Sequence, residues 1–376
     1  MQVSKDLIKA EAKNLGFSFC EFAPIQQTPH YEQYITALKN NCLGNLEFLK
    51  QQYVTEGRRD PKKLMASGKT AIVLGINYHS QLLEPLSPLH GVISRYAIFP
   101  DYHRILKQKS RELINTLKNS TGEDFATKIF VDSGPVMEKD FAALTGAGSI
   151  GKNSLFIHPE FGSFLLLCVI FTNFDLDAAP YTETDLCGAC NRCREACPTN
   201  CIKENRTLKI DECLSYLTVE HEGVVSENLR GMFGNHVFGC DICQEVCPYN
   251  LKKRDNVPSF FDMRPELEQT ENIAKLLKMK ETQFFEKYKF TVIFKSGFTR
   301  FLRNVLIAAG NMRDESFLPS IRDHLQAKNP LIRSHAVWAF SHYKTGDARK
   351  IFEGCLNEEK SPAVISEIRN ALAKMD

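Results

Sequence analysis

Apolar positions follow two different patterns along the chain. In residues 4–15 they recur at helical spacing and end at Gly16, which predicts an amphipathic surface helix. Residues 71–78 and 164–172 are continuous apolar runs, partly β-branched and bounded by turn residues, as is typical of buried strands. Helical stretches such as residues 102–117 lie between them. The N-terminal region is therefore predicted to form an α/β sandwich.

The C-terminal region shows helical periodicity without strand signals. Residues 301–310, 331–340 and 364–374 look alike, and Arg303 and Arg333 occupy matching positions 30 residues apart. An internal repeat of this length indicates two-helix units that stack into a solenoid of the HEAT type, for which three copies are about the minimum. Three unrelated helices in a bundle are the alternative.

The cysteine-rich segment between these regions is too short and too rich in loops to be stabilised by apolar burial alone. A bound cofactor could supply the missing stability. We therefore expect a multidomain α/β protein with three domains: an α/β domain over residues 1–174, a cysteine-rich domain over 175–258, and helical repeats over 259–376.

Charge is balanced over the whole chain but not along it. The 376 residues include 47 Lys and Arg against 45 Asp and Glu, so the net charge of +2 does not drive the protein onto a polyanion. Residues 250–376, however, hold 22 basic and 16 acidic side chains. There Lys295, Arg300 and Arg303 are interleaved with aromatic residues, a pattern suited to phosphate contacts and to stacking on unpaired bases. A plain solvated face is the alternative.

Neither a membrane span nor a secretory signal fits the sequence. The longest run without polar residues, 164–171, has eight positions, whereas a membrane helix needs about 20. Charged residues occur throughout residues 1–17, unlike in a leader peptide. We expect a cytoplasmic protein with no membrane contact, in which the thirteen cysteines do not form disulfides.

Seven of the cysteines form two tight runs between Cys187 and Cys247. The first run is C-x2-C-x2-C-x3-C-P, in which three thiolates bind one face of an iron–sulfur cube and the fourth binds a second cluster. Zinc is the alternative, but structural zinc sites commonly take two separated pairs of ligands. The run therefore predicts two 4Fe-4S clusters.

The second run lacks one ligand, because Val237 stands three positions before Cys240, where a thiolate belongs. Two clusters need eight thiolates and the runs supply seven, so Cys201 or Cys213 completes the set. We favour Cys213, because Cys201 follows the first run so closely that the chain should already be packing back there. Crossing the runs as in ferredoxins gives one cluster on Cys187, Cys190, Cys193 and Cys247, and another on Cys197, Cys213, Cys240 and Cys243.

Two low-potential clusters form an electron relay, so a site that accepts the electrons is expected beside them. In residues 131–154, Asp132 follows a strand-like run and a glycine-rich loop at Gly146, Gly148 and Gly151 follows a helical segment. Glycines let the backbone approach a large ligand closely, but this spacing is not that of a dinucleotide-binding fingerprint. Taken alone, Asp132 could equally be a turn or cap residue.

These motifs together resemble the epoxyqueuosine reductase family, cobalamin-dependent iron–sulfur enzymes of tRNA modification that are related to reductive dehalogenases. The resemblance covers nearly the whole chain, in order. It rests on the ferredoxin run together with D-S-G-P-V from Asp132, E-K-D from Glu138, G-K-N-S from Gly151, G-S-F from Gly162, S-Y-L-T from Ser215 and G-C-D-I-C-Q-E-V-C-P from Gly239.

The resemblance implies a fold and a reaction. The fold would comprise a nitroreductase-like α/β domain that holds the cobalamin, a two-cluster ferredoxin-like domain and a HEAT-like tail that helps to hold tRNA. The reaction would remove the epoxide oxygen of epoxyqueuosine at the tRNA wobble position, using two electrons and two protons. Asp132 matches the family's proton donor, a role for which burial should raise its pKa.

The resemblance also suggests contacts for each partner. Besides Asp132, the expected cobalamin contacts are Arg58, Asn153, Ser154, Ser215 and Asp241, each of which could instead be an ordinary salt-bridge, cap or loop residue. The residues expected to contact the tRNA anticodon stem-loop are His221, Lys295, Arg300 and Arg303. We expect a monomer that takes electrons from an external donor of the flavodoxin or ferredoxin type.

Two other functions stay open from the sequence. A reductive dehalogenase would share the cobalamin and both clusters, but it usually carries a twin-arginine export signal and has no use for a basic helical tail. A non-enzymatic iron–sulfur electron-transfer protein would need neither Asp132 nor the glycine loop.

Overall fold

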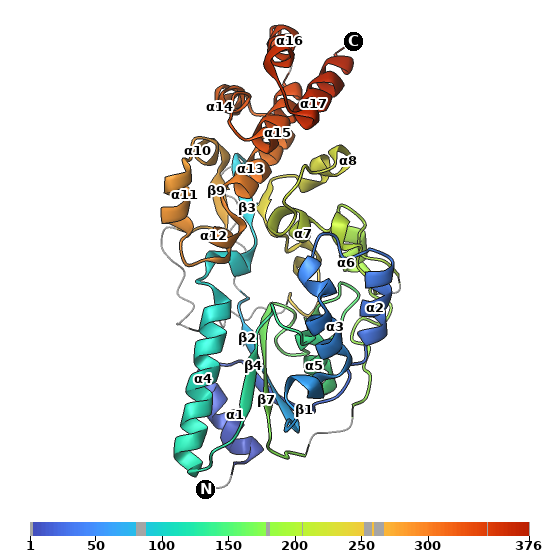
Figure 1. Ribbon diagram of the computed structural model, residues 1–376, viewed down its shortest axis with the longest axis vertical. Helices are drawn as coiled ribbons and strands as arrows, with labels where there is room; N and C mark the ends of the chain where they lie inside the picture. The colour runs from blue at the N-terminus through green and yellow to red at the C-terminus, as the bar shows by residue number, and fades with distance from the viewer. Residues whose placement is uncertain are drawn as a thin grey trace. The chain divides into compact units, whose positions relative to one another are not determined.

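The computed structural model describes residues 3–79, 88–177, 181–204, 206–251, 258, 267–343 and 345–375 (Figure 1). The chain divides into two compact units. Unit 1 comprises Met1–Gln81, Pro100–Asp211 and Ile242–Asp262, and unit 2 comprises Leu82–Phe99, Glu212–Asp241 and Met263–Asp376. Within the described ranges, no helix is long and apolar enough to cross a membrane.

The cysteine-rich segment is shared between the two units. Residues 212–241 group with the C-terminal helices, whereas the flanking parts of 175–258 group with the N-terminal sheet. The three-domain division therefore stays a prediction, and its boundary at 258/259 adjoins residues 259–266, which lie outside the described ranges.

Unit 1 is built on a four-stranded antiparallel sheet with the strand order β1-β2-β7-β4. The bounds are Phe19–Pro24 for β1, Thr70–Asn77 for β2, Leu165–Thr172 for β7 and Thr127–Phe130 for β4. The two predicted apolar runs are the central pair, β2 and β7, in register with Val73 opposite Val169. Their burial explains the continuous apolar pattern, because both faces of the sheet are covered.

Helices cover the two faces of this sheet. On one face, α4 (Tyr102–Thr121) places the Ser110 hydroxyl 3.1 Å from the Cys168 sulfur of β7. On the other face, α5 (Glu138–Leu144) packs into a core with Val169 and Phe171 of the same strand. The predicted N-terminal helix is α1 (Lys5–Asn14), whose first turn is capped by the Ser4 hydroxyl. The alternation along β7 thus produces the predicted α/β sandwich (Figure 1).

Shorter elements complete unit 1. The helices are α2 (Tyr31–Lys39), α3 (Gln52–Arg59), α6 (Arg192–Ala196) and α9 (Ile242–Glu245), and the short strands are β5 (Ser149–Ile150) and β6 (Phe156–Ile157). The 3₁₀ turns are η1 (Glu47–Lys50) and η2 (Pro61–Leu64), while η4 (Ile210–Glu212) lies at the boundary between the units.

Unit 2 contains a small sheet and a series of helices. The sheet has the order β8-β3-β9, with bounds His236–Phe238, His90–Ile93 and Thr270–Asn272. Its helices are α7 (Leu214–Val219), α8 (Glu227–Arg230), α10 (Ile273–Leu277), α11 (Glu281–Tyr288), α12 (Val292–Ser296), α13 (Phe298–Met312), α14 (Leu318–His324), α15 (Pro330–Ser341), α16 (Ala348–Glu358) and α17 (Pro362–Ala373). Short 3₁₀ turns are η3 (Arg95–Ile98), η5 (Gly231–Phe233) and η7 (Glu315–Phe317). Strand β9 corrects the expectation that no strand follows residue 258.

The three similar segments of the sequence fall within α13, α15 and α17. Helix α13 packs against α15, and α15 packs against α17, while α14 and α16, which come between them in the sequence, pack beside α15 and α17 (Figure 1). This succession of packed helices is what a stack of two-helix units requires.

Candidate functional site

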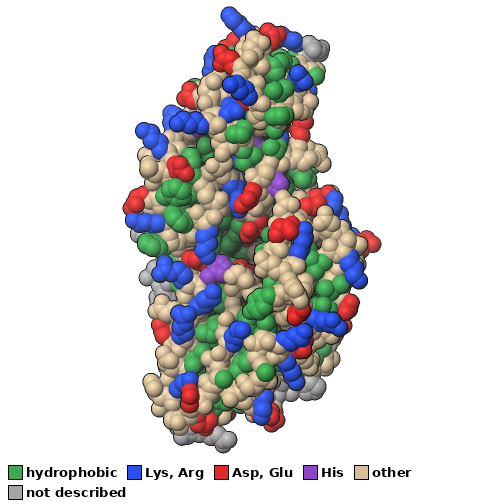
Figure 2. All heavy atoms as spheres, in the orientation of Figure 1, with side chains coloured by type: hydrophobic (Ala, Val, Ile, Leu, Met, Phe, Trp, Pro, Cys, Tyr) green, Lys and Arg blue, Asp and Glu red, His purple; other side chains and the backbone are tan. Residues whose placement is uncertain are grey.

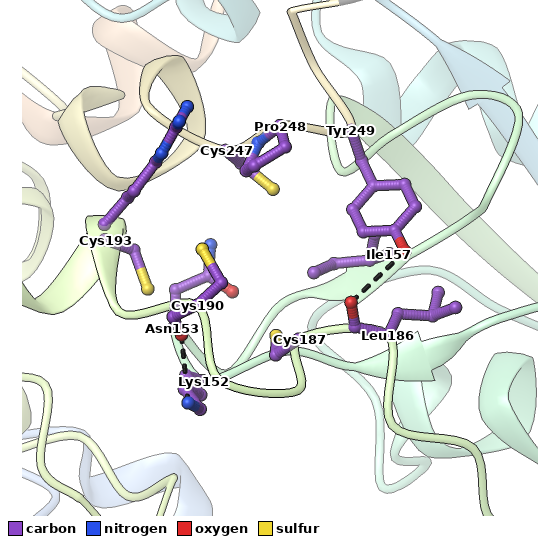
Figure 3. A pocket seen from close by; sticks show the side chains of 11 residues that line it. Lys152, Asn153, Ile157, Leu186, Cys187, Cys190, Cys193, Cys247, Pro248 and Tyr249 are labelled. Carbon is purple, nitrogen blue, oxygen red and sulfur yellow. Dashed lines mark hydrogen bonds between the residues drawn. The ribbon is translucent and has the colours of Figure 1, made fainter.

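Four of the predicted cluster ligands line one cavity in unit 1. Cys187 and Cys190 come from the loop that leads into α6, Cys193 lies in the first turn of α6, and Cys247 comes from the segment after α9. The cavity has a volume of about 310 Å³ and is also lined by Asn153 of the glycine loop. Figure 3 shows the four side chains around a common space. The fold thus brings Cys247 beside three cysteines that are far from it in sequence, as the predicted first cluster requires.

Hydrogen bonds hold the cysteine loop in this conformation. The Lys152 ammonium donates to the carbonyls of Gly188 and Cys190 at 2.8 and 2.9 Å. The Asp185 carboxylate accepts from the backbone N–H groups of Cys187 and Gly188 at 2.9 and 3.2 Å. These contacts satisfy part of the polar backbone of the loop with protein atoms.

The thiols in this cavity affect one another electrostatically. Burial raises the pKa of Cys193, and the neighbouring Cys187 and Cys247 raise it further. Burial likewise raises the pKa of Cys247, with a smaller contribution from Cys187. Crowded thiolates of this kind need a compensating positive charge, which iron would provide.

The remaining candidate ligands lie in both units. In unit 1, the Cys197 sulfur lies 3.5 Å from that of buried Cys201. In unit 2, Cys213 is the N-cap residue of α7 and Cys240 follows β8, two elements that pack together. Cys243 lies in α9 of unit 1. Cys201 therefore stays the alternative to Cys213, and the choice of the eighth ligand stays a prediction.

Asp132 lies at the end of β4, where the chain turns toward α5. Its backbone has φ 56°, a left-handed conformation that is uncommon outside glycine. The Tyr102 hydroxyl donates to Asp132 Oδ2 at 2.8 Å, and His103 Nε2 lies 3.1 Å from the same oxygen. His103 Nδ1 in turn lies 2.7 Å from the Asp101 carboxylate. The first turn of α4 thereby fixes the direction of the Asp132 side chain.

This environment corrects the expected pKa of Asp132. Partial desolvation by the protein atoms around the carboxylate would alone raise its pKa, but the hydrogen bonds from His103 and Tyr102 outweigh that effect and lower the pKa below its ordinary value. The side chain is also 63% exposed. Asp132 is therefore not the buried, proton-holding carboxyl that its role as an acid led us to expect.

Glu138 and Arg58 adjoin Asp132 and carry unsatisfied polar atoms. Glu138 Oε1 and Arg58 Nε have almost no accessible surface and no hydrogen-bond partner among the described residues. Burial, followed by the charge of Asp132, raises the pKa of Glu138 to about 8. The Arg58 guanidinium lies over the Tyr34 ring, 4.7 Å from its centroid, and burial lowers its pKa.

The glycine loop positions two further candidates beside the cysteine segment. Buried Asn153 accepts a hydrogen bond from the Leu155 N–H at 3.3 Å. Ser154, with φ 61°, donates to the Arg206 carbonyl at 3.0 Å, and its own carbonyl accepts from Lys139 at 2.8 Å. The side chains of Asn153 and Ser154 are thus engaged within unit 1.

Unit 2 holds the other two candidate cobalamin contacts. Ser215 lies in the first turn of α7 and is half-buried. Asp241 is 6% exposed and accepts from the Ser94 hydroxyl at 2.6 Å and from the Arg95 N–H at 2.8 Å. It also pairs with the Arg95 guanidinium at 3.3 Å. These contacts give Asp241 a structural role at the end of β3, and its cobalamin contact stays a prediction.

Arg303 does not lie where a phosphate contact requires. It is fully buried in α13 and donates to the carbonyls of Leu217, His221 and Gly223 at 2.5, 2.5 and 3.0 Å. Its remaining donors reach the Asn304 amide oxygen. Burial lowers its pKa to about 9. The prediction that Arg303 binds tRNA directly is therefore wrong, because helical periodicity places it on the inner face of α13.

Arg300 is also committed to protein contacts. One nitrogen donates to the Val219 carbonyl, and another lies 2.8 Å from the Glu222 carboxylate. Lys295 is exposed, so it has the accessibility that the predicted phosphate contact needs. Half-buried His221 lies with Nε2 3.1 Å from the Val224 carbonyl, and burial lowers its pKa.

Exposed aromatic side chains accompany Lys295. Phe285, Phe290 and Phe294 are 37%, 62% and 42% exposed, and the rings of Phe285 and Phe294 lie 5.3 Å apart. Figure 2 shows basic and acidic side chains intermingled on the visible face instead of a large field of one sign. Any nucleic-acid contact in this part of unit 2 would thus combine few charges with apolar rings.

Sequence reasoning missed the residues that orient Asp132. Tyr102 and His103 were assigned only to a helix, and Glu138 only to a motif. The available sequence signal was Asp101, which is the N-cap residue of α4. Its side chain accepts a hydrogen bond from the His103 N–H at 3.1 Å. A tyrosine and a histidine in the first turn of a capped helix could have been considered as partners for a carboxylate.

Comparisons with family models match two parts of the chain. Residues 58–133 match the model described as "Epoxyqueuosine reductase QueG, DUF1730". Residues 186–250 match the "4Fe-4S double cluster binding domain", which includes all eight cysteines of the crossed scheme. The second match supports the two 4Fe-4S clusters that the spacing predicts.

Curated relatives match over most of the chain. An epoxyqueuosine reductase of Cyclobacterium marinum is 32% identical over 303 residues, which are 80% of this chain and 94% of the relative. One of Shewanella oneidensis is 30% identical over 383 residues, covering 98% and 94%.

Solved structures agree with the fold. A selenomethionine-labelled epoxyqueuosine reductase gives a TM-score of 0.91 at 26% identity, with 99% of each chain covered. A complex of an epoxyqueuosine reductase with an epoxyqueuosine-modified tRNA-Tyr stem loop gives 0.88 at 26%, with 98% of each covered. The Bacillus subtilis enzyme gives 0.88 at 27%, with 98% of each covered, and was captured with an aspartate catalytic loop swung out of the active site.

Proposed function

This chain belongs to the epoxyqueuosine reductase family and is an oxidoreductase, and we propose that it reduces epoxyqueuosine to queuosine at the tRNA wobble position with electrons relayed through its two 4Fe-4S clusters. The reaction breaks both C–O bonds of the epoxide, forms a C=C bond and releases water. Two electrons and two protons are consumed.

The observation that carries this proposal is the orientation of Asp132. The contacts from Tyr102 and His103 hold its carboxylate at the end of β4, and a carboxyl group fixed in this way can deliver a proton to a leaving oxygen. The aspartate catalytic loop described for the Bacillus subtilis structure supports the same role.

Cobalamin is the cofactor that we infer for this site. The buried, unpartnered Nε–H of Arg58 fits such a ligand, because the amide side chains of a corrin ring carry carbonyl acceptors. Asn153 and Ser154 on the glycine loop, with Ser215 and Asp241, are the further candidate contacts. When bound, cobalamin supplies a reduced cobalt centre that acts as a nucleophile or electron donor. The chain's own contribution is to orient the carboxyl group and to supply protons.

The iron–sulfur ligands are proposed as the crossed set. Residues Cys187, Cys190, Cys193 and Cys247 would hold one cluster, for which their shared cavity is the support. Residues Cys197, Cys213, Cys240 and Cys243 would hold the other. Electrons would enter from an external donor of the flavodoxin or ferredoxin type.

The partner that we propose is a tRNA anticodon stem-loop carrying epoxyqueuosine, as in the complex with the modified stem loop. Lys295 and His221 stay candidates for its contacts, whereas Arg300 and Arg303 instead support the segment that carries His221. We further propose that the protein acts as a monomer in the cytoplasm, with HEAT-like repeats at its C-terminal end.

The test is single-turnover conversion of a modified stem-loop by reduced, cobalamin-replete protein. Asp132→Asn should slow the reaction by about 10²- to 10⁴-fold, the usual contribution of a general acid, while iron content and cobalamin binding stay unchanged. Asp124→Asn, which alters an exposed carboxylate paired with Lys118, is the matched control and should keep the wild-type rate. A wild-type rate in Asp132→Asn would remove Asp132 from this role.

A further inference from the structure

The reaction needs two protons, but the structure gives Asp132 a pKa that is lowered instead of raised. At neutral pH such a carboxyl is mostly ionised, so it passes protons on more readily than it stores them. A second group close to Asp132 should therefore hold a proton where solvent does not remove it.

Glu138 has the required position. It is the first residue of α5, six positions after Asp132, and the charge of Asp132 acts on it directly. Its Oε1 atom is shielded from solvent and has no partner among the described residues. A carboxylate with one buried oxygen that lacks a hydrogen bond is unfavourable, whereas the protonated form is tolerated.

The surroundings of Glu138 also favour the proton-bearing form. Burial has the largest effect, and Asp132 raises the pKa further to about 8, although a hydrogen bond from the Glu138 backbone N–H, the charge of Arg58 in α3 and the charge of Lys139 in α5 oppose the rise. Cys168, on the sheet side, is itself buried with a pKa raised to about 12, so it adds no negative charge at neutral pH. Two neighbouring carboxyls whose pKa values are pushed apart are a common arrangement for acid catalysis.

We propose that Glu138 is the proton store of this site and that it delivers its proton to the substrate oxygen through Asp132. The inference rests on the proposed function. In each turnover, two electrons arrive from the iron–sulfur relay, one proton passes from Glu138 through Asp132, and the second enters from solvent at exposed Asp132. The epoxide oxygen leaves as water, the alkene forms, and the Glu138 carboxylate is protonated again from solvent before the next turnover.

The direction of transfer follows from the product. Asp132 is a weaker base than the Glu138 carboxylate, so transfer between the two alone is uphill. The oxygen released from an opened epoxide is a far stronger base than either carboxylate, so the complete transfer is downhill. Asp132 therefore acts as the conduit, and Glu138 acts through it as a positioning and storage residue.

The first test is the pH dependence of single turnover in the full-length, cluster- and cobalamin-replete enzyme. The wild-type rate should fall above about pH 8, where Glu138 loses its proton. Glu138→Gln keeps the size of the side chain but removes the titrating group, so its rate should be about 10- to 100-fold lower, with no such fall. Glu138→Asp should recover part of the rate and restore a fall of the rate at high pH.

The matched control is Asp140→Asn. Asp140 is a buried carboxylate of the same helix, but it is paired with His30. The His30 backbone N–H donates to Asp140 Oδ2 at 3.1 Å, and His30 Nδ1 lies 3.0 Å from Asp140 Oδ1. Its replacement should lower stability and leave the shape of the pH–rate profile unchanged. If Glu138→Gln instead shows the wild-type profile, or loses only cobalamin affinity, the proton-store proposal is overturned.

A second readout does not depend on turnover. The infrared carbonyl band of a protonated carboxyl should be present at pH 7, should titrate near pH 8, and should be absent from Glu138→Gln but present in Asp140→Asn. Absence of this band from the wild type at pH 7 would overturn the proposal even if the enzyme is active. Conversely, a wild-type protein that shows the band but never converts epoxyqueuosine would contradict the proposed function and not the protonation of Glu138.

Discussion

Replacing Arg303 with Met should destabilise the segment around α7 without changing how charge contributes to tRNA binding. The side chain is buried, and its guanidinium bonds the carbonyls of Leu217, His221 and Gly223. Methionine fills most of the same volume but donates no hydrogen bonds. The perturbation therefore separates support of the segment from direct contact with phosphate.

The magnitude follows from the three carbonyls left without their donor. A buried unsatisfied polar group costs about 1–3 kcal/mol, and losing one partner of a buried charged arrangement costs about 3–5 kcal/mol. Removing the buried charge of Arg303 itself offsets part of this loss. We therefore expect local opening to become easier by about 3 kcal/mol, which is a factor of about 10² in the opening equilibrium.

Hydrogen exchange and salt-dependent binding measure the two effects separately. Amides of α7 and α13 should exchange about 10²-fold faster in Arg303→Met, whereas Arg322→Met, which removes an exposed ion pair with Asp347, should change little. The slope of log Kd against log salt should stay as in the wild type, but Lys295→Met should reduce it by about 0.7–0.9 if that side chain meets a phosphate. A smaller slope with unchanged exchange in Arg303→Met would refute the structural role.

Three further outcomes are expected. Cys213→Ser should lower the iron content from about eight to about four per chain, whereas Cys201→Ser should keep both clusters; colorimetric iron assays of anaerobically purified protein decide between them. Arg230→Met should destabilise unit 2 by about 3–5 kcal/mol, because it breaks a buried bidentate pair with Glu367 at 2.7 and 2.9 Å, and adding Glu367→Leu should recover much of that loss in thermal unfolding. Removing iron with a chelator should lower the unfolding temperature of the holoprotein, and unchanged melting would contradict a stabilising role of the clusters.

The parts of the fold that the sequence predicted are those with long periodic patterns. Strands β2 and β7 are each eight residues long and buried, so their apolar runs were unmistakable. The short strands β3, β8 and β9 have three or four residues each, too few to show a period of two. Their pairing also joins segments up to about 180 residues apart, which local patterns do not encode.

In the candidate site, too, features set by local spacing were predictable and features set by contacts between distant elements were not. Cysteine spacing was sufficient to predict the two clusters, because ligand geometry imposes a fixed local pattern. The protonation of Asp132 was not predictable from sequence, because it depends on Tyr102 and His103, which approach from a different element. The expectation of a raised pKa considered only burial and overlooked hydrogen bonds to the charged form.

Basic residues in the C-terminal half gave a wrong prediction of tRNA contacts because their partners also come from other elements. Arginines at helical spacing among aromatic residues resemble a nucleic-acid surface, but a guanidinium carries five donors and can equally satisfy exposed carbonyls at a chain turn. Arg303 does so for the segment after α7, Arg230 for the pair with Glu367, and Arg333 for Glu359 together with the Ala327 carbonyl. Because these side chains stabilise unit 2 internally, its net basic count overstates the charge available to RNA, and exposed Lys295 becomes the better guide to where a phosphate could bind.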